Sequence, residues 1–213
     1  MPRTHPEPRW RALLDLALGA LDSLNDEYRW SWGGGTALAV HLGHRDSFDI
    51  DIFFTDSQAL RDLSPQRNAT VRAVTDKWQA PGHYIKLERP EGEIDFIASP
   101  LFSDPGTRAW PYEGRDLPLE TVTEILAKKL HWRGSTALAR DVFDLAAAHR
   151  FTPAEFAAAA ALEKDGATRA ADRIRRQIAR LKRELPAAVR PTAAGAQIFE
   201  TDLLALAGAL DGA

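Results

Sequence analysis

The N-terminal half of the chain mixes helical and strand-like patterns of apolar residues. Over residues 10–24 apolar side chains recur at helical spacing, which predicts an amphipathic helix. A short apolar helix over 37–42 is expected to end at Gly43, and the polar stretch 56–78 is expected to contain a helix that ends near Trp78. Short apolar or alternating runs predict four strands: 28–32, 48–54, 83–89 and 93–98.

The pattern becomes helical after residue 117 and stays so to the end of the printed sequence. Thr152-Pro-Ala-Glu155 has the form of a capping box with proline at the first helical position, so a helix is expected to begin there. Another helix is expected to stop at Pro186, because proline interrupts the helical hydrogen-bond ladder. The helix that stops at Pro186 covers 168–185, and the other boundaries give helices over 119–133 and 136–150.

This change of pattern divides the chain. Its 213 residues are enough for one or two domains. The first, 1–115, is expected to be an α+β domain with a β-sheet core, and the second, 116–213, an all-α C-terminal domain.

Composition excludes several classes of protein and site. The chain has no cysteine, which rules out disulfides, a thiol nucleophile and cysteine-ligated metal. No apolar run approaches the roughly 18 residues of a membrane-spanning helix, and Asp15 interrupts the only N-terminal stretch that resembles a signal peptide. A cytoplasmic protein that does not enter membranes is therefore expected.

Charge is distributed unevenly along the chain. The net charge is −3, but residues 164–190 carry nine basic and three acidic residues. Five arginines in this segment step by four, three, four and three residues, which would place them in one stripe on a helix. A charged stripe is commonly only a solvated face, yet five unpaired arginines repel one another and favour an anionic partner such as RNA. The stripe consists of Arg169, Arg173, Arg176, Arg180 and Arg183.

Two carboxylates on one apolar strand point to a metal site. Within the expected strand 48–54, alternation places Asp49 and Asp51 on the same face. Paired carboxylates there are costly unless a cation lies between them, and Mg²⁺ or Mn²⁺ suits such oxygen ligands. Asp95, between apolar neighbours on the strand 93–98, could supply a third ligand or could be a paired edge-strand residue. A solvated strand end is the alternative for the first two.

A glycine-rich turn precedes this strand. Gly34, Gly35 and Thr36 lie between a strand and a short helix, where free backbone N–H groups favour phosphate. Arg45 could donate two hydrogen bonds to a phosphate and Ser47 one more, although either could be an ordinary solvated loop residue.

These features together resemble a known family. Residues 32–53, which run from Trp-Gly-Gly-Gly-Thr to Phe-Asp-Ile-Asp-Ile-Phe, are similar to the opening motifs of the nucleotidyltransferase superfamily. More narrowly, the chain resembles the AbiEii/AbiGii abortive-infection toxin family, with a helical lysine motif at 124–130 and Arg-Asp-x-x-Asp at 140–144. The resemblance runs from residue 32 to about residue 145.

The resemblance implies a nucleotidyltransferase core with a mixed sheet, an NTP donor and Mg²⁺ on Asp49 and Asp51. It also implies that Gly34, Gly35 and Thr36 hold the phosphates. Lys129 would contact the triphosphate, with Lys128 as the other candidate, and either Asp141 or Asp144 would be a functional carboxylate.

Helical geometry is compatible with those assignments. Lys129 and Arg133 are four residues apart and share a helix face, and Asp141 and Asp144 are three apart on the next helix. The alternative is a structural salt bridge between Arg133 or Arg140 and these aspartates.

The expected function is Mg²⁺-dependent transfer of NMP from an NTP to an acceptor. By resemblance the acceptor is RNA, at the 3′ end of a tRNA, and the protein is a toxin with a cognate antitoxin. The alternatives are transfer to a small molecule or a protein side chain, and a non-catalytic module that binds nucleotide or RNA.

Overall fold

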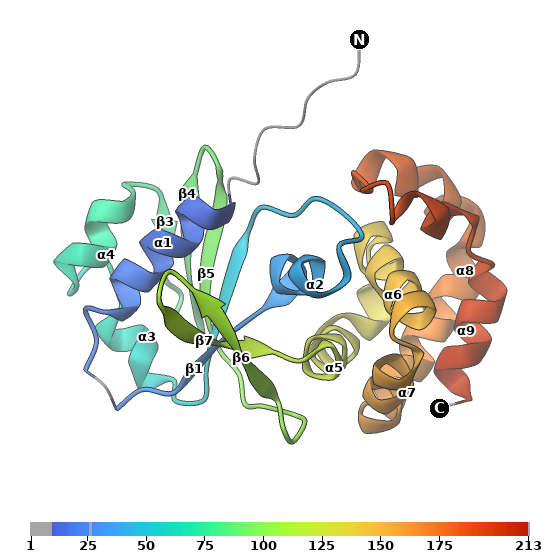
Figure 1. The fold of residues 1–213 in the computed structure, drawn as a ribbon, viewed down its shortest axis with the longest axis horizontal. Coiled ribbons are helices and arrows are strands. Elements are labelled where there is room, and N and C mark those ends of the chain that lie inside the picture. Colours follow the sequence, from blue (N-terminus) through green and yellow to red (C-terminus); the bar gives the residue numbers. More distant parts are fainter. Residues whose placement is uncertain (1–9, 26, 213) are drawn as a thin grey trace, which may run out of the picture. The chain divides into compact units, whose positions relative to one another are not determined.

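A computed structural model describes residues 10–25 and 27–212 of the chain (Figure 1). The described residues form two compact units. Unit 1 takes in the described residues up to Ala37 together with 47–101 and 108–120. Unit 2 takes in 38–46, 102–107 and the described residues from Thr121 onward. None of the described helices is both long and apolar enough to cross a membrane.

Unit 1 is built on a mixed sheet, as the sequence predicted. The strand order is β3-β4-β5-β2-β1-β7-β6. Strand β2 pairs in parallel with β5 and β1 in parallel with β7, whereas β1–β2, β3–β4 and β4–β5 are antiparallel. The strands are β1 (Trp30–Gly33), β2 (Ile50–Phe54), β3 (Trp78–Gln79), β4 (Tyr84–Arg89), β5 (Gly92–Ala98), β6 (Thr107–Tyr112) and β7 (Arg115–Glu120).

The core of unit 1 lies between this sheet and three helices. Along β2, Ile50, Ile52 and Phe54 are buried, while Asp51 points to the opposite face. Helix α1 (Trp10–Leu21) packs its apolar stripe against β2 and β5, as its helical spacing predicts. Helices α3 (Gln58–Asp62) and α4 (Ala69–Val74) lie on the same side of the sheet (Figure 1).

Unit 2 is helical. Its core is formed by apolar faces of the helices, including the fully buried Val142, Phe143 and Ile174. Helix α8 packs along α9 and also contacts α5 and α6. The helices are α5 (Val122–Arg133), α6 (Ala139–Phe151), α7 (Pro153–Leu162), α8 (Lys164–Ala188) and α9 (Leu203–Asp211), with short 3-10 turns at Gly134–Thr136 and Ala196–Glu200. Helix α2 (Gly34–Leu42) begins among the residues of unit 1 and ends among those of unit 2.

Several local expectations for unit 1 were wrong. Strands β6 and β7 were not predicted, because Pro111 and Pro118 interrupt both runs. The two strands are joined at Glu113 and Gly114, whose positive φ angles of 47° and 80° form a tight hairpin. Trp78 lies in strand β3 and does not end a helix.

Other differences concern helix ends and one strand end. Helix α2 already begins at Gly34, and Asp49 precedes strand β2. The capping box at Thr152 does not form, because that hydroxyl donates to the carbonyl of Ala148. Pro186 lies inside α8, two residues before its end, where it costs one hydrogen bond of the last turn without stopping the helix.

Candidate active site

A row of four residues crosses the sheet of unit 1. Gly33 on β1 is in register with Asp51 on β2, Asp51 with Asp95 on β5, and Asp95 with Lys86 on β4. Residues in register on neighbouring strands present their side chains on the same face. Two carboxylates and one ammonium group therefore lie side by side on the face opposite the unit 1 core.

Gly34 explains how the first carboxylate is placed. A Cβ atom on Gly34 would lie 1.9 Å from Oδ2 of Asp51, and this glycine has a φ of +73°. Only glycine allows the backbone at the start of α2 to approach the carboxylate so closely. The glycine-rich turn thus sets the Asp51 side chain against the first turn of a helix.

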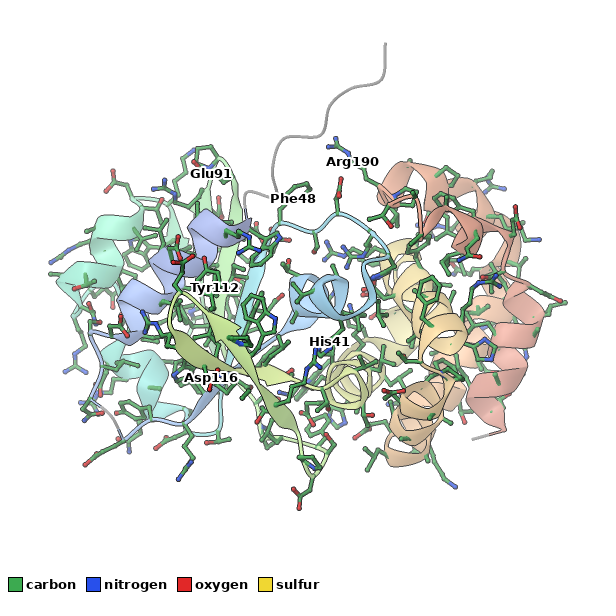
Figure 2. All side chains as sticks on the ribbon, viewed as in Figure 1. His41, Phe48, Glu91, Tyr112, Asp116 and Arg190 are labelled. Atoms are coloured by element: carbon green, nitrogen blue, oxygen red, sulfur yellow. The ribbon has the colours of Figure 1, made fainter. Side chains whose placement is uncertain are left out.

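Asp49 lies beside the same sheet but outside the row. One of its carboxylate oxygens, Oδ1, accepts a hydrogen bond of 3.1 Å from the backbone N–H of Glu93 on β5. Figure 2 shows Phe48, which precedes Asp49, at the same end of the sheet as Glu91 in the β4–β5 turn. Asp49 therefore lies just before β2 and is held by a backbone N–H of β5, and its role as a metal ligand stays a prediction.

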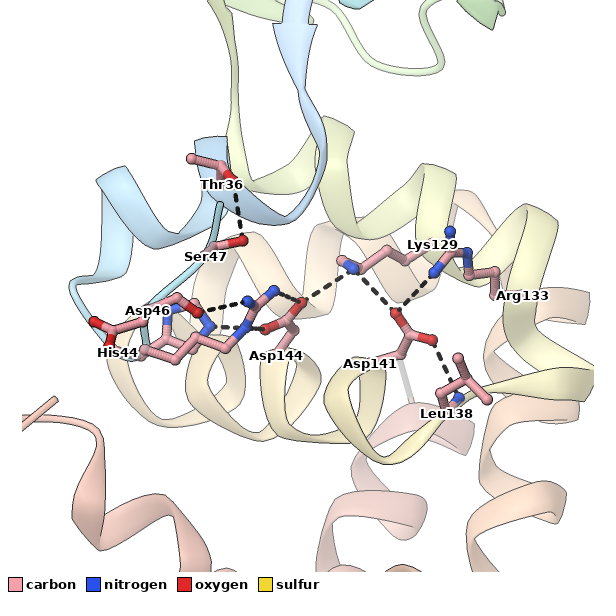
Figure 3. Close-up of polar contacts among 10 residues, drawn as sticks. Thr36, His44, Asp46, Ser47, Lys129, Arg133, Leu138, Asp141 and Asp144 are labelled. Atoms are coloured by element: carbon pink, nitrogen blue, oxygen red, sulfur yellow. Dashed lines mark hydrogen bonds and ion pairs between the residues drawn. The ribbon is translucent and has the colours of Figure 1, made fainter. Parts of the chain in front are cut away.

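Thr36 connects the helix start to the segment that leads into β2. Its hydroxyl is hydrogen-bonded to the Ser47 hydroxyl at 2.9 Å and to the carbonyl oxygen of Asp49 (Figure 3). Both expected phosphate-binding side chains, Thr36 and Ser47, are thus in contact within unit 1. Their role toward phosphate stays a prediction.

The environment of Asp95 fits a bound cation. Burial, together with the negative charge of Asp51, raises the pKa of Asp95 to about 6, although Lys86 acts in the opposite direction. One Asp95 oxygen, Oδ1, is buried and has no hydrogen-bond partner among the described residues. A hard divalent ion prefers such carboxylate oxygens and would relieve the repulsion between Asp51 and Asp95. Within the described part of the chain, no group of three or more histidine, aspartate or glutamate side chains is already gathered as a metal site.

Unit 2 contains a second polar group, made of five charged residues and one histidine, which we call the charged cluster: His44, Arg45, Lys129, Arg133, Asp141 and Asp144. Asp144 is fully buried and accepts hydrogen bonds from Arg45 Nε at 2.6 Å and Nη2 at 3.0 Å. His44 Nε2 lies 2.8 Å from the same carboxylate and Lys129 Nζ lies 3.0 Å from it. The dashed lines of Figure 3 follow this network.

Electrostatics keeps Asp144 and Lys129 ionised. Burial alone would favour a neutral Asp144, but Lys129 and Arg45 hold the pKa of this carboxyl well below its usual range. Burial opposes the charge of Lys129 too, yet Asp144 and Asp141 raise the pKa of its ammonium group. Lys129 is therefore protonated throughout the physiological pH range.

Asp141 has two roles in this cluster. It pairs with Lys129 at 3.1 Å and lies 3.5 Å from Arg133. Its other oxygen accepts from the backbone N–H of Leu138 at 3.1 Å, which caps the start of α6. Asp141 and Asp144 thus both form ion pairs with Lys129. The structure also contains the alternative salt bridge, between Arg133 and Asp141.

The two neighbouring lysines are in different surroundings. Lys128 is buried and lies 3.3 Å from Glu124, one turn earlier on α5. Glu124 in turn accepts from the backbone N–H groups of Phe102 and Ser103. Lys129 joins the charged cluster through Asp141 and Asp144, and which of the two lysines contacts the triphosphate stays a prediction.

His44 and Arg45 reach the charged cluster from a loop. This loop is held by an isolated antiparallel bridge between Arg45 and Pro191 and by the Thr192 hydroxyl, which donates to the Gly43 carbonyl at 2.6 Å. The guanidinium of Arg45, expected on a phosphate, lies on Asp144. The phosphate role of Arg45 stays a prediction.

Sequence reasoning missed His44 and Lys86. His44 is fully buried and stacks on Phe143, and nothing in the local pattern of residues indicates this. Lys86 had a usable signal, because Ile85 and Leu87 on either side are apolar and alternation sends Lys86 to the polar face of its strand.

The arginine stripe does not lie on one straight helix. Helix α8 is kinked at Gln177, where φ is −127° and ψ is 21°. Arg180 pairs with Glu184 at 2.6 Å, and Arg173 is half-buried with its Nε atom covered. The five arginines are therefore divided between two helical segments, and their contact with RNA stays a prediction.

Comparisons with known proteins identify a family and solved structures of similar fold. The family "Nucleotidyl transferase AbiEii toxin, Type IV TA system" matches residues 17–207. The chain is similar to a crystal structure from H. pylori that is assigned as a nucleotidyltransferase, with a TM-score of 0.50 and 17% sequence identity. The match covers 97% of this chain and 93% of the H. pylori chain. It is also similar to the solution structure of the antibiotic-resistance factor ANT(2'')-Ia, with a TM-score of 0.51 and 16% sequence identity. That match covers 84% of this chain and 99% of the ANT(2'')-Ia chain. No curated protein is significantly similar to the chain.

Proposed function

Since the chain belongs to the AbiEii nucleotidyltransferase toxin family, we propose that it transfers NMP from an NTP to an RNA acceptor, at the 3′ end of a tRNA. Nucleotidyl transfer, an NTP substrate, a toxin role and an antitoxin partner follow from the family itself. The acceptor, the metal and the roles of individual residues are proposals. The observation that carries the proposed catalytic centre is the register of Asp51 with Asp95, next to the glycine turn.

We assign Asp49, Asp51 and Asp95 to a divalent ion, Mg²⁺ or Mn²⁺. Such an ion, when bound, activates an attacking hydroxyl and stabilises charge on the leaving pyrophosphate. Asp95 would offer Oδ1, its unpaired oxygen, and Asp51 is held in place by the close approach of Gly34. Asp49 would offer the oxygen that Glu93 does not occupy.

The remaining assignments concern the nucleotide and the acceptor. The first turn of α2, at Gly34, Gly35 and Thr36, presents backbone N–H groups that suit phosphate oxygens. Lys129 is assigned to the triphosphate, because its neighbouring carboxylates keep it protonated. In the transfer, the acceptor hydroxyl oxygen forms a bond to the α-phosphorus and its proton passes to solvent. The bond from the α-phosphorus to the oxygen that bridges it to the β-phosphorus breaks, and pyrophosphate leaves with that electron pair.

Labelled nucleotides test this proposal directly. The purified chain is incubated with each α-labelled NTP and Mg²⁺ or Mn²⁺, with total tRNA or without RNA. Label is expected on tRNA, and Asp51→Asn should lower its incorporation by about 100-fold or more, because electrostatic stabilisation in such sites is worth several kcal/mol. Asp76→Asn, a matched change at an exposed residue of unit 1, should leave incorporation unchanged. Label on a small molecule or on the protein would contradict the RNA acceptor, and unchanged activity of Asp51→Asn would contradict the site.

A further inference from the structure

Lys86 lies where the motifs of the chain place no functional residue. It is on β4, in register with Asp95, and its side chain is only 22% exposed. Its Nζ atom lies 3.2 Å from Oδ2 of Asp95 and also pairs with Glu93. Strand pairing thus places a fixed positive charge next to a proposed metal ligand.

The two oxygens of Asp95 have different surroundings. Oδ2 bonds to Lys86, whereas Oδ1 is buried and unpaired among the described residues. Because Asp51 is in register on one side of Asp95 and Lys86 on the other, Asp95 lies between a like and an opposite charge. Lys86 therefore neutralises Asp95 from one side and leaves a single oxygen without a partner.

A divalent ion beside Asp51 would be subject to two opposite electrostatic forces. Asp95 attracts the ion, and the ammonium of Lys86 repels it and competes for the same carboxylate. In the row of residues across the described sheet, Lys86 is the basic side chain, and its neighbours are Asp95, Asp51 and Gly33. Because of Lys86, the net negative charge that the ion encounters is smaller by one.

We propose that Lys86 is a positioning residue of the metal centre, which holds Asp95 through Oδ2, presents Oδ1 as its one metal-binding oxygen and weakens the affinity for the divalent ion. The inference rests on the proposed function, in that it takes Asp51 and Asp95 as metal ligands. It predicts an enzyme that releases its metal readily when no nucleotide is bound.

Binding of Mn²⁺ to the full chain without nucleotide, followed by electron paramagnetic resonance, tests this role. Lys86→Met should lower the Kd for Mn²⁺ by about tenfold or more, because the positive charge 3.2 Å from Oδ2 of Asp95 is removed. Lys86→Arg should keep the wild-type Kd. Lys77→Met makes the same chemical change at an exposed position of unit 1 and should leave the Kd unchanged.

A double variant isolates the route of the effect. In Asp95→Asn the additional change Lys86→Met should lower the Kd by a smaller factor than it does in the wild type, because only the direct repulsion between Lys86 and the ion is left. Far-UV circular dichroism checks that each variant is folded, and Lys86→Gln replaces Lys86→Met if the latter does not fold.

The outcomes separate this inference from its premise. If Asp51→Asn abolishes Mn²⁺ binding while folded Lys86→Met binds Mn²⁺ as the wild type does, or more weakly, the role of Lys86 is overturned and the metal centre stands. If Asp51→Asn binds Mn²⁺ as tightly as the wild type, the metal centre fails and the role of Lys86 fails with it.

Discussion

The charged cluster of unit 2 leads to a quantitative prediction: Asp144→Ala should lower the free energy of unfolding by about 3–5 kcal/mol. Asp144 is fully buried and accepts from Arg45, His44 and Lys129. Its removal leaves these donors buried without their acceptor. Each charge-assisted hydrogen bond is worth about 1.5–3 kcal/mol, but the values do not add, because Lys129 keeps its ion pair with Asp141.

Urea unfolding at neutral pH, followed by far-UV circular dichroism, measures this loss. Asp172→Ala is the matched control, because its carboxylate is about half exposed and lies 3.7 Å from Arg175 on the surface of α8. Exposed pairs of this kind contribute about 1 kcal/mol or less. Asp144→Asn, which keeps the size of the side chain and removes its charge, should fall between the control and Asp144→Ala.

The pH dependence gives an independent check. The pKa of Asp144 is depressed in the folded chain, so its contribution to stability is present above the unfolded pKa, about 3.9. That contribution is lost as pH falls toward the folded pKa. The difference between wild type and Asp144→Ala should therefore shrink below about pH 4. A loss at neutral pH no larger than that of Asp172→Ala would refute the argument that this cluster stabilises unit 2.

Three further predictions concern other residues. Lys129→Ala should raise the NTP concentration needed for transfer. Lys128→Ala should destabilise α5 through the loss of its ion pair with Glu124, but should leave the NTP requirement of the folded enzyme unchanged. Steady-state kinetics distinguish the two variants, and the reverse result would assign the triphosphate contact to Lys128. The pKa of Asp95 is raised to about 6 in the folded chain, so its ionisation destabilises the metal-free protein. As pH rises from about 4 to 7, the wild type should lose about 2–3 kcal/mol of unfolding free energy relative to Asp95→Asn. Urea unfolding at several pH values measures this difference, and a difference that does not change with pH would contradict the prediction. The triple variant Arg173→Gln, Arg176→Gln and Arg180→Gln removes three positive charges from α8. The slope of log K for RNA binding against log salt concentration should become shallower by roughly two to three. An unchanged slope would show that this helix does not contact RNA.

Local patterns in the sequence were sufficient to predict much of unit 1. The alternation of Ile50, Asp51 and Ile52 shows which face of β2 is buried, because successive side chains on a strand point to opposite faces. The same reasoning, together with the glycine turn and the order of the motifs, led to the nucleotidyltransferase fold and its family. It could not predict β6 and β7, since two prolines obscure runs that only pairing with β1 and with each other stabilises.

The partners of the charged side chains depend on tertiary structure. Lys86 meets Asp95 only because β4 and β5 pair in one particular register, and a shift by one residue would send Lys86 to the opposite face. Arg45 and Asp144 are 99 residues apart in sequence, and their contact requires the loop before Ser47 to pack on α6. Residue type and spacing show which side chains can carry charge and which face of an element they share. The partner of each charge depends on strand register and loop packing, which bring together residues that are far apart in the sequence and therefore leave no local pattern.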